Sequence, residues 1–143
     1  MDTEPPTSSV AIGPRVGVGA AILDDEGRLL LVKRRRAPEA GCWGLPGGKV
    51  EFLEPLETAV VREIEEELGI RITLQGLVCL TDQIDEAHST HWVAPVYLAH
   101  IKDGAPVNRE PDALAAIGWF PLEELPDRLT IATRQALPWL LRK

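Results

Sequence analysis

The sequence has few of the features that mark secreted, membrane or nucleic-acid-binding proteins. Its two cysteines, Cys42 and Cys79, are too few for a disulfide framework and lack the spacing of a metal motif. No apolar run reaches the roughly 20 residues of a membrane span. The acidic start, with Asp2 and Glu4, lacks the apolar core of a secretory signal. We therefore expect a cytoplasmic protein with no membrane partner.

Basic charge is also scarce, with 15 lysines and arginines against 22 acidic residues. A pI near 5.0 argues against non-specific binding to nucleic acid. The negative charge is concentrated, because residues 51–67 hold seven glutamates and one basic residue, Arg62. That segment carries a net charge of −6 (1 − 7), against −7 for the whole chain. Such a cluster repels itself unless a cation belongs there.

The acidic segment carries the signals of a helix. Pro55 suits the first helical position, because the N–H that it lacks would be unpaired there. Glu57 can reach back to the helix start, and Gly69 suits a left-handed C-cap. The sequence therefore predicts a helix from about Pro55 to Leu68.

This helix has an apolar face and an acidic face. Residues spaced i, i+3, i+7 form the apolar face: Val61, Ile64 and Leu68. Residues spaced i, i+3, i+4 form the acidic face: Glu63, Glu66 and Glu67. Like charges about 6 Å apart cost roughly 3 kcal/mol per pair at an effective dielectric of about 20, and the helix dipole disfavours anions in the last turns. A solvated acidic surface is one interpretation, but the pattern favours a site for a hard divalent cation such as Mg²⁺.

The same residues resemble the Nudix box. Gly48, Glu54 and the run from Arg62 to Ile70 match G-x5-E-x7-R-E-U-x-E-E-x-G-U, with U aliphatic, at every specified position. The flanking WGLPGG at residues 43–48 is also usual in this family. The resemblance implies a Nudix hydrolase, a Mg²⁺-dependent enzyme, with Mn²⁺ as an alternative, that cleaves a diphosphate linked to a nucleoside or a similar group.

The resemblance also implies roles for single residues. The implied metal ligands are the main-chain carbonyl of Gly48 and the side chains of Glu63, Glu66 and Glu67. Arg62 is expected to fix the loop by pairing with Glu54. One position departs from the common pattern, since many members have glycine where this chain has Leu53. If that turn requires a positive φ, leucine is strained there.

The catalytic candidates are Glu63, Glu66 and Glu110. A general base must reach the attacking water directly or through one more water. Glu66 can do so if the metal does not engage it fully. Glu110 and Asp112 lie in the loop before the last strand, where related enzymes place a carboxylate. Ala115 stands where glutamate is frequent in such sequences, which weakens the case for a base in this loop.

Substrate contacts are expected from two places. Lys33 and Arg34 are candidates for binding phosphates, although a basic run such as residues 33–36 can also be a solvated loop. Trp43 could stack on a nucleobase, but a tryptophan before LPGG is more often a packing residue.

Residues beyond the box favour a nucleoside triphosphate as substrate. The region about 16 residues after the box, residues 85–87, lacks the proline of ADP-ribose hydrolases. The tyrosine of diadenosine polyphosphate hydrolases is also absent. The layout therefore resembles the group that hydrolyses (d)NTPs to (d)NMP and pyrophosphate. The alternatives are an ADP-ribose or nucleotide-sugar pyrophosphatase and a catalytically silent Nudix domain that senses a ligand.

The chain is expected to form one α/β domain over residues 15–143, after a flexible tail at residues 1–14. The resemblance implies an α/β/α sandwich around a mixed β-sheet. It also implies a nucleotide as the small-molecule partner and allows a homodimer. Strands are predicted at Val16–Leu23, Arg28–Val32, Ile72–Thr81, Trp92–Ile101 and Ala116–Phe120, with a polar connection at residues 82–90. A second helix is predicted at Leu129–Leu141, where Pro138 should kink or break it.

Overall fold

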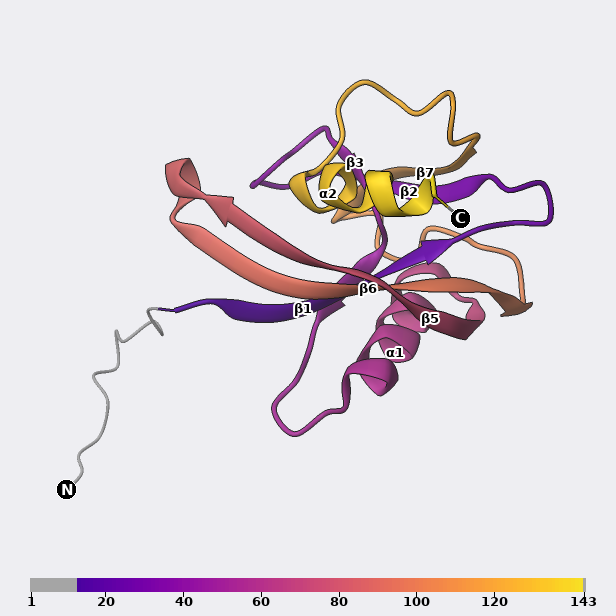
Figure 1. Cartoon of the computed structure of the whole chain (residues 1–143), viewed down its shortest axis with the longest axis horizontal. Helices are drawn as coiled ribbons and strands as arrows, with labels where there is room; N and C mark the ends of the chain where they lie inside the picture. Colours follow the sequence, from indigo (N-terminus) through magenta and orange to yellow (C-terminus); the bar gives the residue numbers. More distant parts are fainter. Residues whose placement is uncertain (1–12, 143) are drawn as a thin grey trace.

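The computed structural model describes residues 13–142, so most of the tail predicted for residues 1–14 lies outside the described part (Figure 1). Its elements, in chain order, are β1 (Arg15–Ile22), β2 (Leu29–Arg34), β3 (Trp43–Gly44), β4 (Gly47–Lys49), α1 (Leu56–Leu68), β5 (Arg71–Asp85), the 3₁₀ helix η1 (Glu86–His88), β6 (Thr90–Asp103), β7 (Leu114–Phe120) and α2 (Ile131–Leu140). None of the helices within residues 13–142 is long and apolar enough to cross a membrane.

The strands form one mixed sheet and one antiparallel sheet. The mixed sheet has the order β4-β1-β6-β5, in which β1 runs parallel to β6 and antiparallel to β4. The second sheet has the order β3-β2-β7. Figure 1 shows α1 and α2 on opposite sides of the β1-β6-β5 strands. The predicted α/β/α arrangement around a mixed sheet is therefore confirmed.

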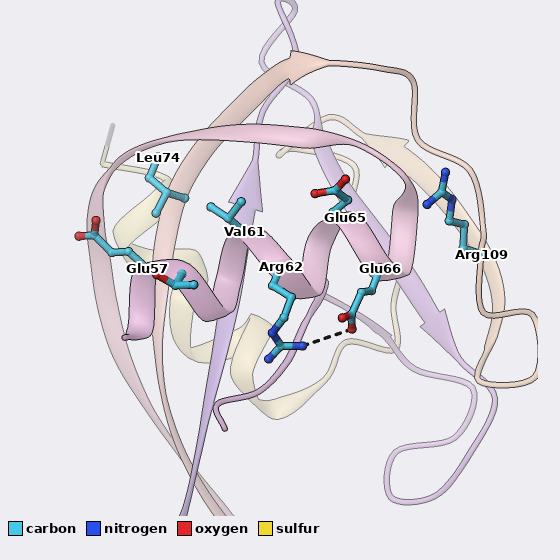
Figure 2. Close-up of a pocket in the computed structure, with 8 residues that line it drawn as sticks. Glu57, Val61, Arg62, Glu65, Glu66, Leu74 and Arg109 are labelled. Atoms are coloured by element: carbon cyan, nitrogen blue, oxygen red, sulfur yellow. Dashed lines mark hydrogen bonds and ion pairs between the residues drawn. The ribbon is translucent and has the colours of Figure 1, made fainter. Parts of the chain in front are cut away.

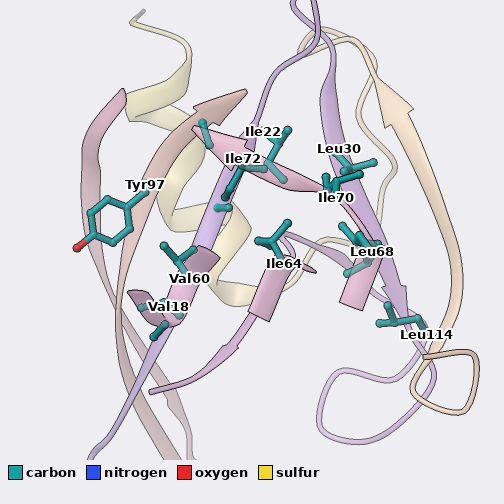
Figure 3. Close-up of a cluster of buried hydrophobic side chains, with 14 residues drawn as sticks. Val18, Ile22, Leu30, Val60, Ile64, Leu68, Ile70, Ile72, Tyr97 and Leu114 are labelled. Carbon is teal, nitrogen blue, oxygen red and sulfur yellow. The ribbon is translucent and has the colours of Figure 1, made fainter. Parts of the chain in front are cut away.

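Alternation along β6 explains why both faces of the mixed sheet are covered. Tyr97 and Ala99 point to one face and join the core beneath α1, which includes Ile64 (Figure 3). Val96 points to the other face and joins the core that includes Ala136 of α2. Because successive side chains of a strand point to opposite faces, one strand supplies both cores.

Helix α1 agrees with its prediction in extent and differs at its start. Pro55 takes the N-cap position, with ψ of 147°, and not the first helical position. No side chain caps the helix start, so Glu57 does not reach back as expected. The helix ends where predicted, at Gly69, whose φ of 71° is left-handed. Ile64 is fully buried, whereas Val61 is only partly buried.

Several other element predictions are wrong. Residues 82–90 were expected to be a polar connection, but β5 and β6 continue through most of them and meet at η1. Polar residues are tolerated in these strands because side chains alternate between the two faces: Thr81 is buried, whereas the next residue, Asp82, is exposed. The two short glycine-containing strands β3 and β4 were not predicted. Pro138 does not break α2, because Leu141 N still donates to Leu137 O at 2.9 Å.

Strand β5 lies at the edge of the mixed sheet, and the side chain of Gln135 from α2 binds its main chain. Asp82 N donates to Gln135 Oε1 at 2.7 Å. Gln135 Nε2 donates to Asp82 O, also at 2.7 Å. One amide side chain thus pairs both main-chain groups of Asp82.

The loop before α1 contains the strain anticipated for Leu53. Its φ is 68° and its side chain is 86% exposed, so the conformation costs energy and the leucine gains no burial. A left-handed L-residue costs about 1–2 kcal/mol, partly offset in a glycine variant by the entropy of the unfolded chain. We expect Leu53→Gly to stabilise the protein by about 0.5–1 kcal/mol, raising Tm by about 1–4 °C in calorimetry. Leu53→Ala keeps the Cβ and should show no such gain; a lower Tm for the glycine variant would contradict the strain.

Candidate active site

Two carboxylates of α1 approach the main chain of β4. Glu67 is 9% exposed, and its Oε1 accepts a hydrogen bond from Gly47 N at 3.2 Å. The Glu63 carboxylate lies directly against Gly48, since a Cβ at that glycine would overlap it. A Cβ at position 48 would displace this carboxylate, so the glycine allows the contact, and the Gly48 main chain and the two carboxylates are neighbours.

Arg62 fastens the loop before α1, as expected. Its Nε and Nη2 donate to the two carboxylate oxygens of Glu54 at 2.7 and 2.9 Å. Nη2 also donates to Lys49 O at 3.1 Å. The Arg62 guanidinium lowers the pKa of Glu54 to about 2. A bidentate, charge-assisted pair of this kind fixes geometry as well as adding stability.

The three predicted metal-binding glutamates differ in their surroundings. The Glu63 and Glu66 side chains, 19% and 53% exposed, each accept a hydrogen bond from Arg62 Nη1 at 3.2 Å. Glu67 instead contacts Gly47. Within residues 13–142, no three acidic, histidine or cysteine side chains already converge on one point as metal ligands would. The structure therefore brings Glu63 and Glu67 together beside Gly48 and turns Glu66 toward solvent.

The electrostatics at Glu67 fit a cation. Burial raises the pKa of Glu67 to about 8, helped by the negative charges of Glu110 and Glu63 and opposed by the Gly47 N–H and Arg34. Burial also raises the pKa of Glu63. The second oxygen of Glu67 has no hydrogen-bond donor among the described residues. A buried carboxylate with one neutral donor and acidic neighbours suits a hard divalent ion, and the oxygen-only ligand set is the one that Mg²⁺ prefers.

Two hollows flank this part of α1. One is a cavity of about 340 Å³ lined by Glu67 and Gly47 at the acidic site, and by Arg34, Gln83 and Trp92. The other is an open depression of about 840 Å³ on the outer side of α1, shown in Figure 2, where Glu66 meets Arg62. The buried Glu67 lines the smaller, less open cavity, so that cavity is the better place for a substrate.

The predicted substrate contacts occupy different positions. Arg34 lines the cavity, and its Nε donates to Pro38 O at 2.9 Å. Lys33, which precedes Arg34 in β2, is not among the residues that line the cavity. Trp43 packs edge-on against Phe120, with ring centroids 4.9 Å apart, and belongs to the second core. Trp43 is therefore a packing residue in the structure. A contact of Lys33 with phosphates stays a prediction.

The loop bearing Glu110 is attached to the end of α1. Val107 N donates to Leu68 O at 2.9 Å, and Arg109 N donates to Glu67 O at 3.0 Å. Asn108 Oδ1 accepts from Glu110 N at 3.0 Å. Glu110 consequently lies close enough to Glu63 and Glu67 to raise the pKa of both. The structure shows no contact of this kind for Asp112, which is exposed.

Several residues lining the cavity were missed as site candidates: Glu39, Lys49, Thr81 and Gln83. Trp92 was predicted only as the first residue of a strand. Alternation could have placed Trp92, Ala94 and Val96 on one face, but their closeness to Gln83 depends on the pairing of β5 with β6. That pairing extends through residues that the sequence suggested were a connection.

Known proteins similar to this chain identify its family. The NUDIX domain family model matches residues 13–140. An ADP-ribose pyrophosphatase from Methanocaldococcus jannaschii is 35% identical over 79% of this chain, which spans 65% of that protein's length. A CTP pyrophosphohydrolase from Escherichia coli is 45% identical over 53% of this chain and 61% of its own.

Among solved structures, a MutT NUDIX hydrolase from Burkholderia pseudomallei is 63% identical, with a TM-score of 0.85 over 89% of this chain and 98% of that one. The complete box, its fold around Gly48 and α1, and these similarities agree. The chain therefore belongs to the Nudix hydrolase family.

Proposed function

We propose that this protein hydrolyses nucleoside triphosphates to nucleoside monophosphates and pyrophosphate with the help of Mg²⁺. The observation that carries the proposal is the buried Glu67, whose pKa is raised to about 8 and which lines a cavity beside the Gly48 main chain. Its partners as metal ligands are the Gly48 carbonyl, Glu63 and Glu66. Glu66 must turn from Arg62 to take part, which its exposure allows.

The chain's own residues have separate roles in this reaction. When bound, the metal neutralises phosphate oxygens and activates water. The Arg62–Glu54 pair holds the loop that presents the Gly48 carbonyl. Arg34 is oriented by Pro38 O and offers its remaining N–H groups to substrate phosphates. The water oxygen forms a bond to phosphorus and Glu110 accepts the proton that the water loses. The P–O–P bond breaks, and pyrophosphate leaves.

The substrate class rests on the residues outside the box and on similar proteins. The sequence layout resembles triphosphate hydrolases, and the MutT protein from Burkholderia is 63% identical over nearly its whole length. The Methanocaldococcus relative, named an ADP-ribose pyrophosphatase, makes a diphosphate-linked sugar the second candidate.

A nucleotide panel with Mg²⁺ separates these substrates. We expect a triphosphate to yield phosphate only after inorganic pyrophosphatase is added, because the primary product is pyrophosphate. ADP-ribose would yield monophosphates that pyrophosphatase leaves unchanged and alkaline phosphatase converts to free phosphate. Hydrolysis of ADP-ribose in preference to every triphosphate would replace the proposed substrate. Binding without hydrolysis of any compound would indicate a sensing domain.

A further inference from the structure

The cavity has an end remote from Glu67 that carries its own polar groups. Trp92 and Gln83 are cross-strand partners in the β5–β6 pair, and Val96 pairs with both Gly19 and Cys79. Gly19 in turn pairs with Gly47, the residue that contacts Glu67. Val96 lies four positions after Trp92 in β6, which corresponds to about 13 Å along the strand. If phosphates lie near Glu67, the other end is where a nucleobase would lie.

Small residues, including Gly19 and Ala94, line the cavity between these ends. The indole of Trp92 packs over Gly17 of β1, where a Cβ would meet Trp92 Cε3 at 3.4 Å and Gly48 O at 3.1 Å. Ala94 and Thr81 are paired neighbours that also line the cavity. Small side chains beside the indole of Trp92 make a surface suited to a planar ring.

The orientation of the Gln83 amide is fixed by a short hydrogen-bond chain. Thr81 is fully buried, and its hydroxyl donates to Ala94 O at 2.8 Å. A hydroxyl has one proton to donate, so towards Gln83 it must act as acceptor. Gln83 Nε2 donates to Thr81 Oγ1 at 3.0 Å accordingly. The amide oxygen of Gln83 is left as a hydrogen-bond acceptor for the cavity that the residue lines.

Glu39 supplies a second acceptor to the same cavity. It lies in the loop between β2 and β3 and lines the same cavity. Its Oε2 accepts from Ile131 N, at the start of α2, at 2.7 Å. Its Oε1 has no donor among the described residues, and a carboxylate can only accept.

We infer that Glu39 and Gln83 are specificity-determining residues that select a nucleotide whose base carries an exocyclic amino group. This inference rests on the proposed function and adds the substrate's base to it. Two acceptors favour a base that donates, such as the amino group of cytosine, and oppose one that presents a carbonyl oxygen at that place. CTP and UTP form a matched pair for the test, because they differ at the amino-bearing edge of the base.

The experiment compares kcat/KM for CTP and UTP in the full chain with Mg²⁺, and the affinities for CMP and UMP without turnover. We expect the wild type to favour the cytosine nucleotide roughly 10- to 100-fold in both measurements. Glu39→Gln can keep the bond from Ile131 N through its amide oxygen while turning an N–H₂ to the cavity. It should shift the ratio toward the uracil nucleotide, a change that a capping role alone would not cause. Gln83→Leu should reduce the preference.

Matched control variants are Glu123→Gln and Gln75→Leu, exposed residues outside the cavity lining, and both should keep the wild-type ratio. Equal treatment of CTP and UTP by the wild type, or an unchanged ratio in both cavity variants, would overturn the inference. Failure to hydrolyse any triphosphate would instead overturn the proposed function. The CMP-to-UMP affinity ratio would then decide the inference by itself.

Discussion

Replacing Glu67 by glutamine should reduce kcat roughly 10²- to 10⁴-fold at saturating Mg²⁺. The reason is that a metal ligand supports several kcal/mol of transition-state stabilisation, and about 1.4 kcal/mol corresponds to a factor of ten. Glu67 is the most buried of the three helix carboxylates in the proposed metal site and contacts the Gly47 main chain. We expect Glu66→Gln to show a loss of the same kind. Glu65→Gln, in the same helix turn but at a free position of the box, is the matched control and should keep its turnover.

In the absence of metal, the same variant should be more stable than the wild type above pH 4.5. The folded pKa of Glu67 is about 8, above its ordinary value of 4.5. Below pH 4.5 the Glu67 carboxyl is protonated in both the folded and the unfolded state, so its ionisation does not lower the free energy of unfolding. Between pH 4.5 and 8 only the unfolded state releases its proton, so the wild type loses stability as pH rises. Glu67→Gln should abolish this loss.

Mg²⁺ should counter the loss in the wild type, because it binds the folded state and replaces the proton of Glu67. Thermal scans at pH 5 and pH 8, with EDTA and with several millimolar Mg²⁺ plus a substrate analogue, measure both effects. We expect the largest rise in Tm for the wild type at pH 8 and little rise for Glu67→Gln. Near-normal kcat in the Glu66 and Glu67 variants, together with equal Mg²⁺ responses, would rule out a metal site here.

Replacing Glu110 by glutamine should lower kcat by about 10²–10⁴ with little change in KM, because general-base catalysis contributes about that much. Its loop is bound to the end of α1 through Arg109 N and Glu67 O. Its charge raises the pKa of Glu63 and Glu67, which places it beside the acidic site. The pH profile of kcat at saturating Mg²⁺ should also lose its acidic limb in this variant.

Asp112→Asn provides the control for this experiment, because Asp112 is an exposed carboxylate of the same loop. It should leave both kcat and the pH profile unchanged. If Glu110→Gln costs less than about tenfold and the acidic limb survives, another group accepts the proton. Glu66 would then be the next candidate, and a Glu66→Gln, Glu110→Gln double variant would test whether the two share the role.

The sequence predicted the parts of the site that depend on neighbouring residues. The extent of α1 and its left-handed end at Gly69 follow from spacing within one segment. The pairing of Arg62 with Glu54 was implied by the resemblance to the Nudix box, whose residues lie in the same segment. The strain at Leu53 was predictable for the same reason.

What the sequence could not predict depends on contacts between distant segments. Glu39 reaches α2, 92 residues away, and Gln83 reaches the cavity only through the pairing of β5 with β6. The outward turn of Glu66 is equally invisible in the spacing, which places it with Glu63 and Glu67. A repeating pattern shows which face a residue occupies but not which partner its side chain takes.

The amide of Gln135 beside Asp82 has a consequence for how this protein behaves at high concentration. An exposed edge of a β-sheet is a template on which other chains can assemble. At Asp82 the main-chain N–H and C=O are already hydrogen-bonded, because the Gln135 amide occupies the place that the peptide group of an added strand would take. A foreign strand would have to displace this amide before it could extend the sheet across the middle of the β5–β6 arm. One residue of α2 thus protects the longest strand of the protein from unwanted self-assembly at that point.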